Sequence, residues 1–290
     1  MSRHIEQNIC CFHGCHNHGS VSVSLWKRGG RPAVICSEHV RRLYGYHTMN
    51  LVYRGVETDG FTYAFEGETD YSDIKAKAEL FDVDFLPTRD STCDIEFKSP
   101  IYRNLKAPVK HARTIERLVN EGHLTIGEGC GTHFHVGHVE HINGTTMRWL
   151  RRFYNSLFTP LSDEIMRDVE KSAKLFGRKP NTWCEPVTMR TTSGNLDGDD
   201  MPHSIMFNLQ HDKTIEFRQC KLQSAEQYRQ CMNFCKEVTN ALIETFIQHF
   251  MDTNYPNVGT PGSRTAYRKT LAEITAREMV QIYRKYTENL

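Results

Sequence analysis

Short runs of β-branched and aromatic residues, bounded by turn residues, recur along the chain from about residue 60 onward. Such runs predict β-strands, here near residues 61–68, 92–98, 129–138, 203–210 and 213–220. Asp212 and Lys213 stand between the last two runs, which predicts a hairpin at that point. Alternate side chains of a strand point to opposite faces of a sheet, so each predicted strand can present one face to a core and another to solvent or ligands.

Apolar residues at helical spacing predict helices between and after these strands. The helices are expected near residues 72–81, 106–121, 145–157, 161–176, 224–250 and 264–287, with a Pro/Gly-rich loop at 252–263. The clearest helix spans 224–250, where one face repeats Met232, Cys235, Val238, Leu242, Phe246 and Phe250. Strands and helices alternate without a regular βαβ rhythm, which favours an α+β fold. The chain has neither a P-loop nor a GxGxxG dinucleotide fingerprint.

Composition divides the chain into a small N-terminal module and one large domain. Residues 1–44 are rich in Cys, His and Gly, and residues 45–59 show no clear period. We therefore expect a zinc-binding module at 1–47 and a large domain at 55–290. The formal net charge of +1 excludes a strong overall attraction to nucleic acid or membranes. Since no apolar run reaches a membrane span of roughly 18 residues and the N-terminus lacks the apolar core of a secretory signal, we expect a cytoplasmic protein.

Three of the predicted strands have titratable residues two positions apart. These pairs are Glu66 with Glu68, His133 with His135, and Glu216 with Arg218. Residues i and i+2 of a strand share a face, while apolar neighbours such as Phe134 and Phe217 point to the other face. Another predicted strand adds Glu96 between Ile95 and Phe97. A single pair of this kind is common on a solvated antiparallel strand, but the three pairs together with Glu96 favour a functional site.

Four carboxylates on one sheet face repel one another unless cations neutralise them. Hard divalent cations with oxygen ligands serve this purpose, and magnesium sites usually involve substrate phosphates as well. One histidine among the ligands is compatible with magnesium or manganese, whereas zinc would use more Cys and His. Cys130 lies next to the His133 and His135 pair in sequence but on the opposite strand face, so a packed thiol is favoured over a nucleophile.

The order FEGE, DIEFKSP, CGTHFHVG and FNLQHDKTIEFR, over residues 60–250, resembles the amidoligase family, a relative of glutamine synthetase. The resemblance implies a curved antiparallel sheet with helices on its outer face. It also implies that Glu68 and Glu96 hold one magnesium ion. The implied ligands of a second magnesium ion are Glu66, His133 and Glu216. His135 would lie beside the substrate or phosphate, Arg218 would neutralise phosphate charge, and Asn208 would help to order the site.

The implied activity is an ATP-dependent ligase that joins a carboxylate to an amine through an acyl phosphate. Phosphoryl transfer needs charge neutralisation more than covalent help from the protein, so Mg²⁺ (or Mn²⁺) and an arginine suffice. The sequence does not identify the carboxylate or the amine. One alternative is a nucleic-acid-associated binding protein whose zinc module acts and whose ligase-like domain is non-catalytic. Another is a metal-dependent hydrolase that uses the HxH strand, although no HExxH helix is present.

The N-terminal module has two ligand pairs at the spacing of a structural zinc site. Ten cysteines in a cytosolic protein favour metal ligands or buried thiols over disulfides. Cys10 and Cys15 form one pair, and Cys36 and His39 the other, about twenty residues further on. Cys11 is an alternative to Cys10. His13, His16 and His18 are further candidate ligands, although each is expected to be exposed.

The stretch CSEHVRRLYG resembles the small zinc modules at the N-termini of phage and bacterial HNH endonucleases, although no HNH core follows it. We therefore expect the protein in the cytosol of a bacterium or of a phage-infected host. The module is basic because it contains Lys27, Arg28, Arg31, Arg41 and Arg42. Nucleic acid is one possible partner of such a surface, and a solvated surface on a purely structural zinc site is the alternative.

The first prediction concerns this zinc site. Purified protein should contain about one equivalent of zinc per chain, because a four-ligand site is the unit that structural zinc requires. Metal analysis of the wild type and of Cys36→Ser tests it, and the variant should lose the metal. A full zinc equivalent in Cys36→Ser would exclude the proposed ligand set.

Overall fold

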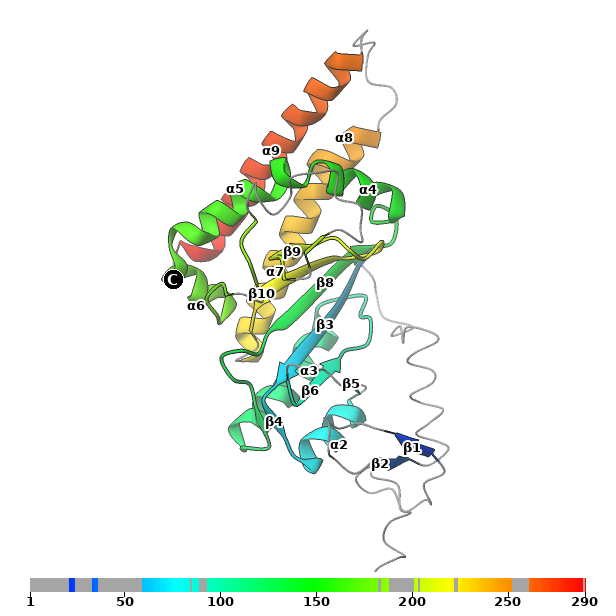
Figure 1. Ribbon diagram of the computed structural model, residues 1–290, viewed down its shortest axis with the longest axis vertical. Helices are drawn as coiled ribbons and strands as arrows, with labels where there is room; N and C mark the ends of the chain where they lie inside the picture. The colour runs from blue at the N-terminus through cyan, green and yellow to red at the C-terminus, as the bar shows by residue number, and fades with distance from the viewer. Residues whose placement is uncertain are drawn as a thin grey trace, which may run out of the picture. The chain divides into compact units, whose positions relative to one another are not determined.

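The computed structural model (Figure 1) describes most of the large domain and two short strands of the N-terminal module. The described residues are 21–23, 33–35, 59–83, 85–88, 93–181, 184–187, 201–202, 204–221, 224–251, 261–288 and 290. In the module, β1 (Val21–Val23) pairs antiparallel with β2 (Ala33–Ile35). The expected zinc ligands Cys10, Cys15, Cys36 and His39 lie outside the described residues. In the sequence they flank this two-stranded ladder, one pair on each side.

The main sheet has six strands in the order β5-β6-β3-β8-β10-β9. Their bounds are β5 Leu86–Thr88, β6 Ile95–Lys98, β3 Phe61–Thr69, β8 Thr132–His138, β10 Ile215–Cys220 and β9 Phe207–Asn208. The pairs β5–β6, β6–β3 and β9–β10 are antiparallel. A small second ladder pairs β4 (Tyr71–Ser72) with β7 (Leu124–Thr125). The mixture of sheet and helices agrees with the predicted α+β class, and the predicted hairpin is confirmed in β9 and β10.

By its internal contacts the chain forms two compact units. Unit 1 comprises residues 1–57, 64–132 and 222–225, and unit 2 comprises residues 58–63, 133–221 and 226–290. The division passes through β3 and β8, inside the single large domain expected from composition. Each unit is described separately below.

In unit 1, the helix α2 (Ile74–Asp82) packs against β5 and against α3 (Lys106–Asn120), and β5 pairs with β6. Strand β3 alternates buried and half-buried residues along its length, as period-two patterning requires. Its inward side chains join an aromatic core in which Phe65 packs against Phe85 and Phe97 at ring-centroid distances of 5.3 and 6.5 Å. Gly67 lies directly opposite Phe97, and a Cβ atom at Gly67 would come within 2.2 Å of the Phe97 ring.

Unit 2 contains the remaining helices. Their bounds are α4 Gly144–Arg152, α5 Tyr154–Arg167, α6 Val169–Phe176, α7 Ala225–Ala241, the π-helical segment η3 Leu242–Ile247, α8 Gln248–Met251 and α9 Pro261–Thr287. The clearest predicted helix is confirmed in α7 to α8, with a π-helical stretch inside it. The predicted interruption at 158–160 is wrong, because α5 continues through Pro160. The breaks come instead at Phe153, between α4 and α5, and at Asp168. The Asp168 carboxylate accepts the Lys171 backbone N–H and caps the start of α6.

The helices of unit 2 pack through aromatic contacts. Figure 1 shows α5 beside α9 in this unit, a pair with extensive contacts. Phe234 of α7 contacts Phe176 of α6 at 5.4 Å and Tyr283 of α9 at 6.3 Å between ring centroids. The Tyr283 hydroxyl lies 2.5 Å from the buried Ser172 hydroxyl. Among the described residues, none of the helices is both long enough and apolar enough to span a membrane.

The close approach of Phe97 to Gly67 predicts a matched pair of substitutions. Gly67→Ala should lower the free energy of unfolding by about 1–3 kcal/mol, because the added methyl group overpacks the strand against the ring. Gly129→Ala is the control, since a Cβ at Gly129 has no atom within 4 Å. Urea unfolding of both variants checks the difference. Equal stability of the two variants would show that the Phe97 ring moves aside at little cost.

Candidate functional site

Two strands of unit 1 bring three carboxylates and one lysine together. In the antiparallel register of β3 and β6, Glu68 lies opposite Glu96 and Glu66 lies opposite Lys98. The Lys98 Nζ atom lies 2.8 Å from Glu66 Oε1 and 3.6 Å from Glu96 Oε2. Like charges directly opposite each other destabilise a sheet, so the ammonium of Lys98 offsets repulsion between the strands.

The protonation of Lys98 reflects these neighbours. Burial disfavours its ammonium, but the charges of Glu66 and Glu96 and their hydrogen bonds outweigh burial and raise the pKa of Lys98 above its usual value. The side chain of Lys98 therefore stays protonated throughout the physiological pH range. Glu68 is oriented separately, because its Oε2 accepts the Gly131 backbone N–H at 2.7 Å. The glycine-rich turn before β8 thus positions one of the predicted metal ligands.

In unit 2, Glu216 is a buried carboxylate beside three positively charged or titratable groups. Its side chain is 3% exposed, and its Oε1 lies 2.5 Å from Arg218 Nη1 and 3.5 Å from His133 Nδ1. The second oxygen lies 3.9 Å from Nε2 of His211. Glu216 and Arg218 share a face of β10, as the i and i+2 spacing predicted. The buried carboxylate is therefore balanced by a guanidinium from its own strand.

The hairpin that presents Glu216 is attached to α4 and α5. Asn208 lies directly opposite Glu216 in the register of β9 and β10. The Asn208 carbonyl oxygen Oδ1 accepts the Gln210 backbone N–H at 2.8 Å, which shapes the turn. Arg151 of α4 donates to the Leu209 and Gln210 carbonyl groups at 2.7 and 3.0 Å. The role of Asn208 in ordering a ligand site stays a prediction.

His135 lies two residues after His133 on β8 and is buried. Its ring lies 5.3 Å from the ring of His211 in an edge-to-face arrangement. Its Nδ1 atom lies 3.5 Å from the Thr214 hydroxyl. Between the two histidines, Phe134 points to the other face and packs 4.9 Å from Tyr228 of α7. The predicted division of β8 into an apolar side and an imidazole side is therefore present.

Glu66 and Glu96 belong to unit 1, whereas His133 belongs to unit 2. Carboxylate oxygens and an imidazole nitrogen are suitable ligands of a hard divalent cation. The allocation of these residues to two metal ions stays a prediction.

Sequence inspection missed two residues of this site. Lys98 follows Glu96 by two positions, which is the same spacing that identified the other pairs and could have revealed it. His211 lies in the hairpin turn, where no strand spacing applies. Cys130 is buried, and its thiol donates to Asp70 Oδ1 at 3.2 Å. Burial and Asp70 raise the pKa of Cys130 to about 12, which agrees with a packed thiol rather than a nucleophile.

The six described cysteines are buried and form no disulfide, which agrees with the prediction. They are Cys93, Cys130, Cys184, Cys220, Cys231 and Cys235.

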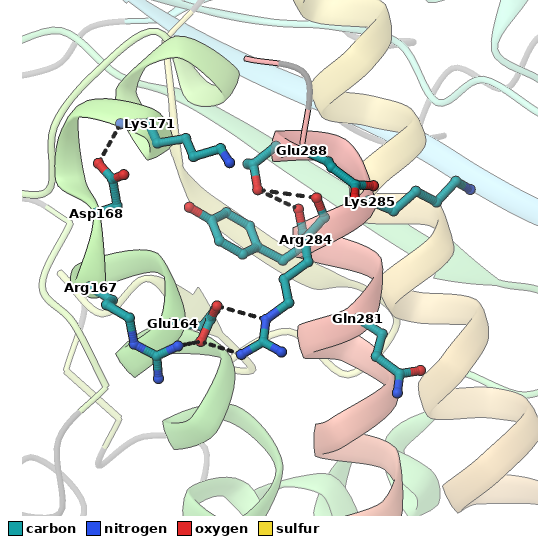
Figure 2. Close-up of a pocket in the computed structure, with 10 residues that line it drawn as sticks. Glu164, Arg167, Asp168, Lys171, Gln281, Arg284, Lys285 and Glu288 are labelled. Carbon is teal, nitrogen blue, oxygen red and sulfur yellow. Dashed lines mark hydrogen bonds and ion pairs between the residues drawn. The ribbon is translucent and has the colours of Figure 1, made fainter.

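A separate hollow of about 450 Å³ lies between α5, α6 and the end of α9 (Figure 2). Glu164 of this hollow pairs with both Arg167 and Arg284, as Figure 2 shows. Lys285 pairs with Glu237, which is not a lining residue of the hollow. We interpret the hollow as a surface feature at which the pair of Glu164 with Arg284 joins α5 to α9.

No protein-family model matches the chain, and no curated protein matches it.

The position of Lys98 predicts a response to divalent cations. Lys98→Met should lower the free energy of unfolding by about 1 kcal/mol at neutral pH, because Glu66 and Glu96 lose their ammonium partner. Mn²⁺ or Mg²⁺ should raise the melting temperature of this variant more than that of the wild type. Lys75→Met is the control, since Lys75 pairs with Glu121 on an exposed surface. An identical response of both variants to the cations would argue against a metal site at these carboxylates.

Proposed function

We propose that the protein is an ATP- and magnesium-dependent ligase that joins a carboxylate to an amine. The observation that supports this proposal most is the set of carboxylates on the adjacent strands of unit 1, where Glu68 lies opposite Glu96 and the Lys98 ammonium contacts Glu66 and Glu96. Carboxylates gathered in this way on adjacent strands need positive charge beside them. Magnesium ions bound together with the substrate phosphates would supply that charge during catalysis.

The residues fit the proposed metal. Oxygen ligands from Glu66, Glu68, Glu96 and Glu216, with His133, match the preference of magnesium or manganese over zinc. Bound magnesium would neutralise the phosphate charge of ATP and draw electron density from the transferred phosphoryl group. We also propose that the chain belongs to the amidoligase family, that its sheet is curved as in glutamine synthetase, and that the protein is cytosolic.

The proposed reaction consists of two successive displacements. A carboxylate oxygen of the first substrate forms a bond to the γ-phosphorus of ATP, and ADP leaves. The amine nitrogen then bonds to the acyl carbon, inorganic phosphate leaves, and the amine gives up one proton. Arg218 would stabilise the negative charge on the transferred phosphoryl group. His135, beside Thr214 and His211, is our candidate for receiving the amine proton.

Glu216 and Arg218 give the main test, because they share a strand face but have opposite proposed roles. Glu216→Gln should weaken magnesium and ATP binding together in calorimetry. Arg218→Ala should retain metal binding but reduce ADP release by about 100-fold or more, because it removes a preorganised charge partner. The activity is measured as magnesium-dependent ADP release with a panel of carboxylates and amines.

Folding must be followed in the same experiment. Glu216 and Arg218 are both buried, and breaking a buried pair costs about 3–5 kcal/mol, so melting temperatures accompany each assay. The matched control is Glu226→Gln with Arg229→Ala, an exposed pair on α7 that should change neither binding nor stability. Wild-type rates in folded Glu216→Gln and Arg218→Ala proteins would refute the ligase proposal.

A further inference from the structure

Arg178 is a buried arginine that lies outside the site described above. It follows Gly177, the left-handed residue that ends α6, and it is 7% exposed. Its Nη2 donates to Asn181 Oδ1 at 2.8 Å. Its Nε is buried and has no hydrogen-bond partner among the described residues. Most of this guanidinium is therefore removed from water with only one neutral acceptor.

A buried guanidinium without a countercharge is costly. The ion pairs of the described residues include a carboxylate partner for Arg218 but not for Arg178. Burying a charge costs several kcal/mol unless an opposite charge and hydrogen bonds compensate for it. A bound anion would offset this cost by supplying an opposite charge.

Backbone contacts connect Arg178 to Arg218 within unit 2. Cys184 N donates to Asn181 O at 3.0 Å, next to the residue that Arg178 contacts. Met206 N donates to Glu185 O at 2.9 Å, and Arg218 N donates to Met206 O at 3.0 Å. The segment that contains Cys184 therefore lies between the two arginines.

The Cys184 thiol is close enough to respond to both guanidinium groups. Cys184 is fully buried, and burial raises the pKa of its thiol to about 12, while the charges of Arg178 and Arg218 oppose that rise. The two cations thus act on one point in the protein. Among the described residues, Glu216 pairs with Arg218, whereas no carboxylate pairs with Arg178.

We infer that Arg178 binds an oxyanion of the substrate, a carboxylate or a phosphate, beside the segment that contains Cys184. A guanidinium offers parallel N–H donors that match either group. This inference rests on the proposed ligase function, and it restricts the substrate class. The substrate would bear a second, permanent negative group besides the carboxylate that is joined to the amine, and Arg178 would select for that group.

Anion-dependent thermal stability tests the inference without turnover. The full chain is melted with glutarate, inorganic phosphate or acetate at constant ionic strength set with chloride. The wild type should be stabilised by glutarate or by phosphate more than by acetate, and the more effective of the two identifies the second group. Arg178→Met should weaken the binding of that anion by about 30-fold or more, which is the usual effect of removing one partner of a buried charged contact.

Arg178→Met also separates a binding role from a structural one. An apolar side chain of similar size relieves the buried charge, so the ligand-free variant should melt at or above the wild-type temperature. Lys179→Met is the control, because Lys179 is the exposed neighbour with a side chain 57% exposed, and it should keep the anion response. A large loss of stability in Arg178→Met without anion would assign Arg178 a structural role. An equal anion response in Arg178→Met and wild type would also overturn the inference.

Magnesium-dependent ATP binding is measured by calorimetry on the same samples. Arg178→Met should retain it, because Arg178 is not a proposed nucleotide ligand. Absence of ATP binding in the wild type would refute the ligase function, whereas the anion response is judged from the melting curves alone. The two proposals can therefore fail separately.

Discussion

Negative charge on and beside the strands is the constraint on which the rest of the candidate site depends. Carboxylates held at fixed positions in a sheet cannot move apart, so each needs a cation or a hydrogen-bond donor at a fixed position as well. Lys98 fills this role for Glu66 and Glu96, and Arg218 fills it for the buried Glu216. These basic side chains offset the repulsion between the carboxylates.

The surrounding structure holds the charged groups rigidly. On the other face of β8, Phe134 packs against Tyr228 of α7, and the hairpin before Glu216 is attached to α4 through Arg151. The Tyr154 hydroxyl of α5 also donates to the Phe207 carbonyl oxygen. Satisfied and well-packed neighbours hold a buried polar group in one position. These contacts therefore fix the positions of the charged groups of unit 2.

Arg178 illustrates how a site can reduce the stability of its own fold. Replacing a buried, incompletely paired charge by an apolar side chain is often neutral or stabilising. Retaining the charge is then explained by binding rather than by folding. The same argument applies more weakly to Glu216, whose charge is compensated within its own strand.

The sequence by itself determined the strand positions and their chemical faces, because the period-two alternation of a strand is a local property. The pairs at 66 and 68, 133 and 135, and 216 and 218 share faces for that reason alone, and the β9–β10 hairpin follows from two strand runs close together in the chain. Tertiary structure decided what no local pattern encodes. The carboxylate contacts of Lys98, the approach of His133 to Glu216, and the burial of Arg178 depend on residues that are distant in sequence. Two local features could have ended the helix here, Pro160 and the capping residue Asp168, and the helix ends at Asp168. Helix α5 continues through Pro160 and packs along α9.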